Sequence, residues 1–273
     1  MIDLLKKFNL SGKTAIITGG AGLLGKSFVS ALLDAECTVI VFDIDIKNIA
    51  SCKKYFAEQS KKNQVLFIKI DITNENEVKK GLRNIKKILK RIPNILINNA
   101  SINPKIDKKF NGRLEVFDIK RWNNEISVGL TGALICTKIF GAEMAKNKSG
   151  VIINIASDLG IIAPNQTIYK IANKNQQNVK PVSYSVVKHG LIGLTRYTST
   201  YWAKDGIRCN ALAPGGVYTN QPSVFVNQLK KLIPLNRMAH VDEYQATLIY
   251  LCSDASSYMN GAVISVDGGR TAW

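Results

Sequence analysis

The sequence has few of the residues that build metal sites and disulfide frameworks. It holds two histidines, His189 and His240, and five scattered cysteines with no Cys-x-x-Cys pair among 273 residues. A zinc site, a Ser-His-Asp triad and a disulfide framework are therefore not expected, and we predict no bound metal. This cysteine usage fits a reducing cytoplasm.

Long apolar runs and a leader pattern are also missing. No stretch approaches the ~18 consecutive apolar residues of a membrane-spanning helix. The N-terminus carries charges inside its apolar stretch and has no cleavage site, so it does not read as a signal peptide. We expect a cytoplasmic protein without a membrane partner.

Acidic residues are scarce: 20 Asp and Glu stand against 37 Lys and Arg, a net charge of +17. Such an excess raises nucleic-acid binding as an alternative. The lysines, however, occur in pairs spread over the whole chain without interleaved aromatic residues, which is typical of solvated helix faces. We expect no nucleic-acid partner, whereas attraction of small anions is compatible with the charge.

Short apolar runs alternate with helical periodicity along the chain. Continuous Val/Ile/Leu runs of this kind predict parallel strands buried on both faces. They span Thr14–Thr18, Thr38–Phe42, Val65–Ile70, Ile95–Asn98, Val151–Ile155, Arg208–Leu212 and Val263–Val266. Helices are predicted at about 23–35, 46–60, 75–91, 118–147, 182–203 and 242–253. The alternation predicts an α/β, Rossmann-type, doubly wound parallel sheet of about seven strands, with helices on both faces and a single domain over 1–273.

Residues 168–180 interrupt this alternation. The segment is polar and basic and reads as a surface insert. Two interpretations stay open: a neutral loop excursion, or a loop that faces the substrate.

Tyr184 and Lys188 stand four residues apart in a predicted helix. Residues at this spacing share a helix face, about 5–6 Å apart. A free tyrosine has a pKa near ~10 and transfers protons poorly at neutral pH. A fixed ammonium beside it favours the phenolate, so the pair is a candidate for acid–base catalysis. Tyr-x-x-x-Lys also arises by chance, so the pair needs support from the rest of the chain.

A glycine-rich turn, Thr18 to Gly25, joins the first predicted strand to the first helix. Glycines in this context let the backbone approach a pyrophosphate at the helix N-terminus. Asp43 ends the second strand, 18 residues after Gly25. A carboxylate there accepts hydrogen bonds from both ribose hydroxyls and repels a 2′-phosphate, which favours NAD over NADP. Asp45 is a weaker candidate that is expected to begin the next helix.

Polar residues also follow the third and fourth strands, at Asp71-Ile72 and at Asn99-Ala100. Each acid could merely cap the helix that follows it. Because three strand ends carry polar groups at the same sheet edge, we predict that they line a cofactor.

With these pieces in order, the chain resembles the short-chain dehydrogenase/reductase family over about residues 10–273. The matching elements are Thr18-Gly19…Gly25, Asp71, Asn98-Asn99-Ala100, Ser157, Tyr184…Lys188, Pro214-Gly215 and Asp267-Gly268-Gly269. The resemblance implies a catalytic Ser157, Tyr184 and Lys188. Tyr184 would move the proton, Lys188 would lower its pKa and bind the nicotinamide ribose, and Ser157 would hold the substrate oxygen.

The resemblance also implies a cofactor site and an assembly. Its residues are Gly19, Gly22, Leu23, Leu24, Gly25, Asp43, Asp71, Ile72, Asn99, Ala100, Tyr184, Lys188, Pro214, Gly215, Val217 and Thr219. Members commonly form homodimers or homotetramers through helices equivalent to 118–147 and 182–203, so one of these states is expected.

Three positions depart from the family pattern. Leu23 stands where a glycine is usual, Ser101 replaces a glycine, and Gly129 replaces an asparagine that holds a proton-relay water. Ser157 and Tyr184 lie 27 residues apart because of the insert. Tyr169 is nearer the usual spacing but has no lysine four residues later, so it is predicted to line the substrate pocket.

The expected pocket is rich in hydrogen-bonding groups. Asn165, Tyr169 and Tyr218 are its candidate substrate residues, and this inventory favours a sugar, polyol or sugar phosphate. The turn and the insert are similar to a branch associated with flagellin or surface-sugar modification. Two alternatives remain: a ketoacyl-type reductase that uses NADPH, and a dinucleotide-binding sensor whose catalysis is impaired at Gly129.

Overall fold

A computed structural model describes residues 4–62, 64–103, 112–169 and 178–273. Within them a seven-stranded sheet runs in the order β3-β2-β1-β4-β5-β6-β7, and all neighbouring strands are parallel. The strands are β1 (Thr14–Thr18), β2 (Thr38–Asp43), β3 (Val65–Lys69), β4 (Ile95–Asn98), β5 (Gly150–Ile155), β6 (Ile207–Pro214) and β7 (Val263–Val266). Every predicted strand is present, which confirms the predicted α/β class.

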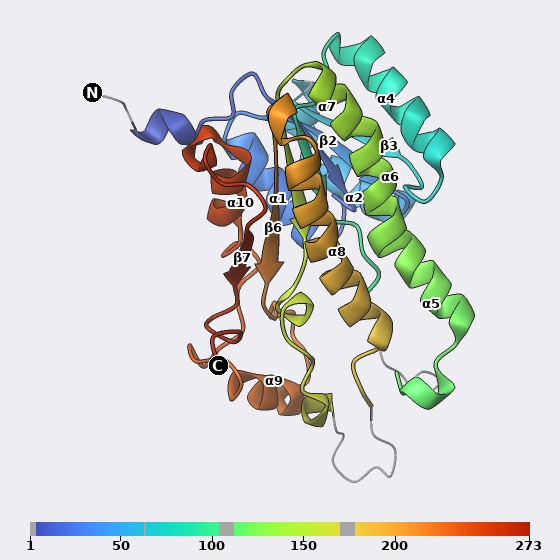
Figure 1. Cartoon of the computed structure of the whole chain (residues 1–273), viewed down its shortest axis with the longest axis vertical. Helices are drawn as coiled ribbons and strands as arrows, with labels where there is room; N and C mark the ends of the chain where they lie inside the picture. Colours follow the sequence, from blue (N-terminus) through green and yellow to red (C-terminus); the bar gives the residue numbers. More distant parts are fainter. Residues whose placement is uncertain (1–3, 63, 104–111, 170–177) are drawn as a thin grey trace.

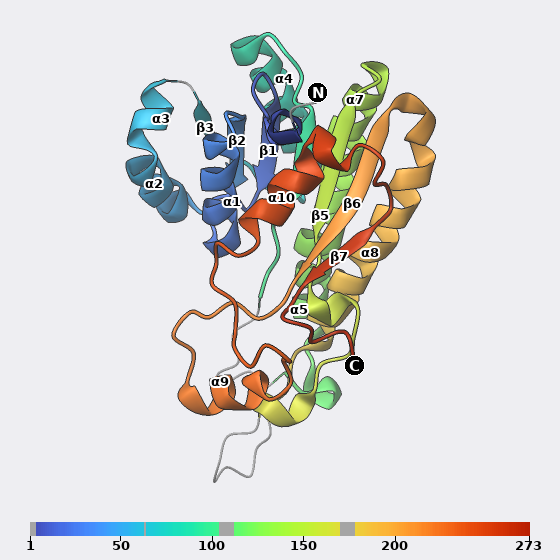
Figure 2. The same cartoon turned by 90° about the vertical axis from the view of Figure 1, so that its left-hand side faces the viewer.

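Helices cover both faces of the sheet (Figures 1 and 2). They are α1 (Leu23–Asp34), α2 (Ile46–Tyr55), α3 (Ala57–Lys61), α4 (Glu75–Leu89), α5 (Ile119–Ile126), α6 (Gly132–Cys136), α7 (Ala142–Lys146), α8 (Val182–Tyr201), α9 (Ser223–Lys230) and α10 (Gln245–Cys252). π-helical turns at Ser127–Thr131 and Thr137–Gly141 join α5, α6 and α7 into one long helix. Short 3₁₀ turns include Leu4–Phe8, Leu114–Val116, Asp158–Gly160, Gln166–Tyr169, Ala203–Asp205 and Asp254–Ser256.

Side chains alternate between two apolar layers. Ile17 of β1 packs with Phe28 of α1 and Leu248 of α10 on one face, whereas Ile16 packs with Ile85 of α4 and Phe140 on the other. Burial of each such side chain stabilises the fold by about 1.5–3 kcal/mol. This two-sided burial is why the strands read as continuous apolar runs.

The helix over residues 119–146 is long and apolar enough, by length and composition, to cross a membrane, which the sequence prediction did not anticipate. Half of the most apolar 18-residue stretch of this helix is buried inside the protein. Cys136, Ile139, Phe140 and Met144 pack in the same cluster as the strands. We therefore assign it as a core helix.

Helix α9 was not predicted from the sequence. This helix lies beyond the ends of β6 and β7 (Figure 1), where Phe225 and Leu229 pack with Ile168 and Met238. Of the predicted insert over residues 168–180, residues 170–177 lie outside the described residues. All five cysteines are buried free thiols.

Candidate active site

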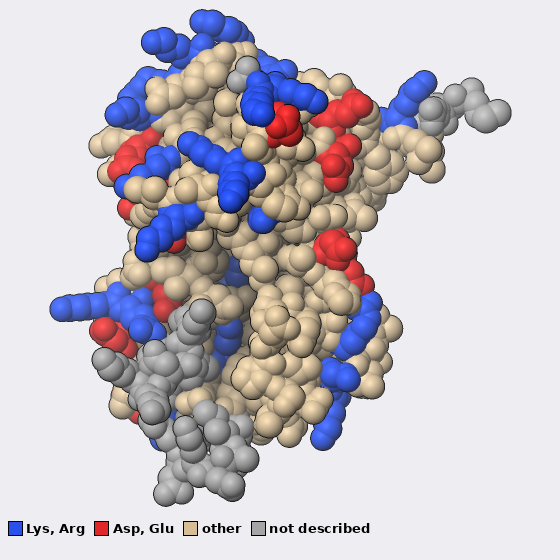
Figure 3. Space-filling view, turned by 180° about the vertical axis from the view of Figure 1, so that it is seen from behind, with Lys and Arg blue, Asp and Glu red and all other residues tan. Residues whose placement is uncertain are grey.

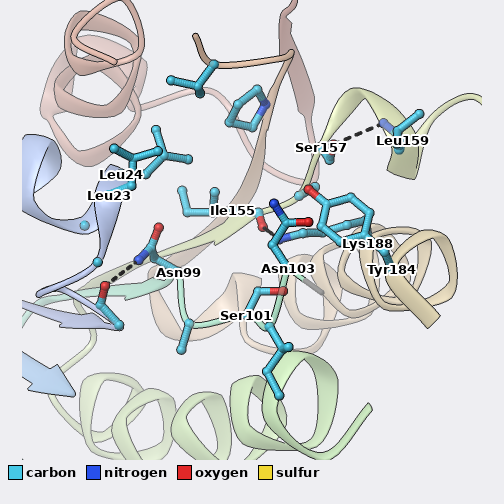
Figure 4. A pocket seen from close by; sticks show the side chains of 18 of the residues that line it. Leu23, Leu24, Asn99, Ser101, Asn103, Ile155, Ser157, Leu159, Tyr184 and Lys188 are labelled. Carbon is cyan, nitrogen blue, oxygen red and sulfur yellow. Dashed lines mark hydrogen bonds between the residues drawn. The ribbon is translucent and has the colours of Figure 1, made fainter. Parts of the chain in front are cut away.

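The carboxyl ends of the strands open into a cavity of about 720 Å³. The strand order reverses between β1 and β4, the position at which doubly wound sheets bind ligands. Ser157 and all of the predicted cofactor residues line this cavity. Figure 4 shows Leu23 and Leu24 on one side of it and Ser157, Tyr184 and Lys188 on the other.

The glycine turn leaves no room for side chains. A Cβ on Gly25 would lie 2.2 Å from the Gly19 carbonyl oxygen, and Gly19 itself has φ +60°. Gly22 is the N-cap of α1 and gives no side-chain cap, so the N–H groups at that helix end face the cavity without one. Leu23, at the position of the usual family glycine, is 57% exposed and does not fill the turn. The turn fits a pyrophosphate.

Asp43 is held at the end of β2 by two backbone groups. Its Oδ2 accepts from Ala21 N at 3.0 Å and its Oδ1 from Asp45 N at 3.0 Å. The first bond ties the glycine turn to β2 and fixes the carboxylate at the cavity. Asp45 instead caps α2 through Lys47 N and Asn48 N, as predicted.

Asn99, which follows β4, and Asp71, which follows β3, lie at the edge of the cavity. Asn99 Nδ2 donates to the carbonyl oxygens of Thr18 and Gly19, at 3.0 Å each, which locks the end of β4 to the turn. Asp71 accepts from Thr73 N and Thr73 Oγ1 and does not cap α4, whose N-cap is Asn74.

Tyr184 sits on the first turn of α8, facing Ser157. Burial raises the pKa of Tyr184; a hydrogen bond with Ser157 acts in the opposite direction, and the Asp158 carboxylate raises it further. The net result is a raised pKa, and the role of Lys188 in lowering it stays a prediction. Proton transfer by Tyr184 needs an additional positive charge or hydrogen bond in the site.

Lys188 is almost fully buried and donates to the Ile155 carbonyl oxygen at 2.8 Å. Its Nζ lies 5.7 Å from the centre of the Tyr184 ring. Burial, and then repulsion by Lys180, lowers the pKa of Lys188 to about 7. This ammonium is thus poised to lose or regain a proton near neutral pH.

A buried ion pair that the sequence analysis missed supports Ser157. Ser157 Oγ donates to Asp158 Oδ1 at 2.8 Å, and Arg270 Nη1 lies 2.7 Å from Asp158 Oδ2. The side chains of Arg270 and Asp158 are only 6% and 4% exposed. Arg270 follows the terminal Gly268-Gly269, but no local pattern marks it as the partner of a residue 112 positions earlier.

Lys180 is the second missed residue. Lys180 is the last residue of the predicted insert, and no role was predicted for it. Its Nζ lies 3.8 Å from the centre of the Tyr184 ring and donates to Asn103 Oδ1 at 2.8 Å. Both Lys180 and Asn103 line the cavity. The insert therefore delivers a cation to the catalytic end.

Gly129 lies where the long helix passes α8. A Cβ at this position would be 2.6 Å from Val187 Cγ1 and 3.5 Å from Ser101 Oγ. The side chain of Val187 thus occupies the space that the family asparagine would need.

The three candidate substrate residues are placed differently. Tyr169 lines the cavity and contacts Phe225, with ring centres 5.5 Å apart. Asn165 is exposed and binds Thr167, while Tyr218 is 47% exposed; both lie outside the cavity lining. Of the three, only Tyr169 lines the cavity, and its contact with the substrate stays a prediction.

Comparisons with known proteins agree with this architecture. A family described as "Enoyl-(Acyl carrier protein) reductase" matches residues 20–271. An NAD-dependent glycerol dehydrogenase of Listeria innocua is 28% identical over 97% of this chain and 96% of its own length. A 2-dehydro-3-deoxy-D-gluconate 5-dehydrogenase of Bacillus subtilis is 30% identical over 96% of each chain. The crystal structure of a gluconate 5-dehydrogenase from Burkholderia cenocepacia, in complex with NADP and tartrate, superposes with a TM-score of 0.84 at 25% identity, covering 98% of this chain and 99% of the other.

Proposed function

We propose a reaction for this chain on the premise that it belongs to the short-chain dehydrogenase/reductase family, in which its dehydrogenase relatives act on a CH–OH group. The chain interconverts a secondary alcohol and a ketone on a sugar, polyol or sugar phosphate, with NAD as the preferred cofactor. The observation that carries the proposal is one continuous cavity with the glycine turn at one end and Ser157, Tyr184 and Lys188 at the other. The glycerol and gluconate dehydrogenases among the relatives support a polyhydroxylated substrate.

The cofactor assignment follows from the residues that are present. The glycine turn fits a pyrophosphate, and the fixed Asp43 carboxylate fits two ribose hydroxyls but not a phosphate ester. A bound nicotinamide would accept the hydride from the substrate carbon. The Burkholderia structure contains NADP, so the preference for NAD rests on Asp43.

The protein residues handle the proton and the oxygen. In the oxidation, ionised Tyr184 accepts the proton of the substrate hydroxyl. Ser157 donates to the developing oxyanion after its hydroxyl rotates away from Asp158, and the Asp158–Arg270 pair keeps Ser157 in position. Lys188, with a pKa of about 7, supplies the nearby charge that Tyr184 needs as a base.

Replacement of Tyr184 by Phe tests the proposal. Removal of a general acid–base is expected to lower kcat by about 10²–10⁴-fold, measured as NADH formation over polyols, sugar acids and sugar phosphates. The affinity for NADH, measured by the fluorescence of the bound cofactor, should change little. An unchanged rate would refute the role of Tyr184. NAD binding by the wild type without turnover on any of these alcohols would instead support the sensor alternative.

A further inference from the structure

We propose that Lys180 binds a negatively charged group of the substrate, so that the alcohol oxidised beside Tyr184 belongs to a sugar or polyol that carries a carboxylate or a phosphate. This inference rests on the proposed function and narrows its substrate class.

The backbone of Lys180 is fixed by a single side chain across the insert. Lys180 N donates to Gln166 Oε1 at 2.7 Å, and Gln166 Nε2 donates to the Lys180 carbonyl oxygen at 3.3 Å. Val182, two residues later, begins α8, the helix that carries Tyr184. Lys180 is therefore held immediately before the helix that carries the catalytic tyrosine.

Among the described residues, the ammonium of Lys180 has one hydrogen-bond acceptor, so donors remain for a ligand in the cavity. An ammonium has three N–H donors. One of them bonds to Asn103 Oδ1 at 2.8 Å, and the group lies 3.8 Å from the centre of the Tyr184 ring. Figure 4 shows Asn103 beside Tyr184 on the catalytic side of the cavity. A ligand beside Tyr184 can thus accept from Lys180 without displacing either contact.

The charges that line the cavity are not balanced at this end. Its acidic residues are Asp43, Asp71 and Asp158, and its basic residues are Lys180, Lys188 and Arg270. Asp43 and Asp71 lie at the ends of β2 and β3, near the glycine turn, and Asp158 is paired with Arg270. Among the described lining residues, the two lysines keep no carboxylate partner at the catalytic end.

Burial makes this excess charge costly, and an anion relieves the cost. Burial lowers the pKa of Lys180 to about 8 despite the opposing effects of Asp158 and Glu125. An anion that replaces lost water around an ammonium stabilises its charged form. The surface charge does not provide the same selectivity, because Lys and Arg are spread over the face in Figure 3 with Asp and Glu between them.

The test uses three compounds with the same carbon chain: D-gluconate, D-glucitol 6-phosphate and neutral D-glucitol. Lys180→Gln should lower kcat/KM for the better of the two anions by about 10–100-fold, mainly through KM, because a hydrogen bond to a charged group is lost. The loss on D-glucitol should be at least about tenfold smaller than the loss on the anion, because only the anion bonds to the ammonium. Lys180→Arg should retain most activity on the anion. Lys231→Gln, which removes an exposed charge outside the cavity, is the matched control. The better anion identifies the group as carboxylate or phosphate.

Equal losses on all three compounds would show that Lys180 acts on Tyr184 and would overturn the proposal, as would no loss on either anion. Equilibrium binding of D-gluconate and of inorganic phosphate to the protein without cofactor provides a readout that does not need turnover. Weaker anion binding in Lys180→Gln than in Lys231→Gln supports the inference even where the proposed reaction fails. A wild type that binds and oxidises neither anion refutes it.

Discussion

At the scale of single residues, Gly129 and Val187 are complementary in size, because the valine side chain lies against the glycine. The side chain of Val187 is 2% exposed, and it fills the volume beside the glycine. The family asparagine is therefore not simply deleted from this chain, since a neighbour has taken its space. Lys180 and Asn103 place polar groups beside Tyr184.

Restoring the asparagine alone is expected to destabilise the protein. In Gly129→Asn the new Cβ would lie 2.6 Å from Val187 Cγ1, and overpacking of this kind costs about 1–3 kcal/mol in free energy of unfolding. Adding Val187→Ala should make the double variant more stable than the sum of the two single changes. Urea denaturation of the four proteins measures this coupling. Strict additivity would contradict the steric explanation.

At the scale of elements, one ion pair joins the segment after β5 to the segment after β7. Arg270→Met would leave the Asp158 carboxylate buried without its partner, which is expected to cost about 3–5 kcal/mol in free energy of unfolding. Asp158→Asn combined with Arg270→Met removes both charges and should recover much of the loss. Thermal or urea denaturation measures both. A double variant no more stable than Arg270→Met would contradict this account of the pair.

The elements were largely predictable, and their long-range contacts were not. Strands such as Thr14–Thr18 and Ile95–Asn98 could be read from the sequence because strands buried on both faces need continuous apolar runs. The α9 helix was missed although Phe225 and Leu229, four apart after Pro222, were its signal. The Asp158–Arg270 pair and the position of Lys180 depend on packing between segments far apart in the chain, which no local pattern encodes.

At the scale of the whole molecule, buried titratable groups make stability depend on pH in two directions. Burial lowers the pKa of Lys188 from 10.5 to about 7, so above pH 7 the unfolded chain holds more protons there and stability rises with pH. Burial raises the pKa of Cys37, Cys136 and Cys209 from 9.0 to about 12. Above pH 9 the folded chain holds more protons at these thiols, and stability falls with rising pH.

The free energy of unfolding should therefore rise from about pH 7 to about pH 9 and decline beyond it. Urea denaturation under reducing conditions over this range measures the profile. Lys188→Met should reduce the rising part, to which Lys180 with its pKa of about 8 also contributes, and leave the decline. A wild-type stability that falls steadily from pH 7 to pH 9, or an unchanged rise in Lys188→Met, would contradict the assignment.

The buried cysteines can also be used to measure local opening of the protein. Cys37 and Cys52 belong to the apolar layer beneath α1 and α10, whereas Cys136 and Cys209 belong to the layer on the opposite face of the sheet. A thiol reagent reaches each cysteine only when its layer opens. The rates at which these cysteines are alkylated would thus time the opening of the two layers separately, with no label added to the chain.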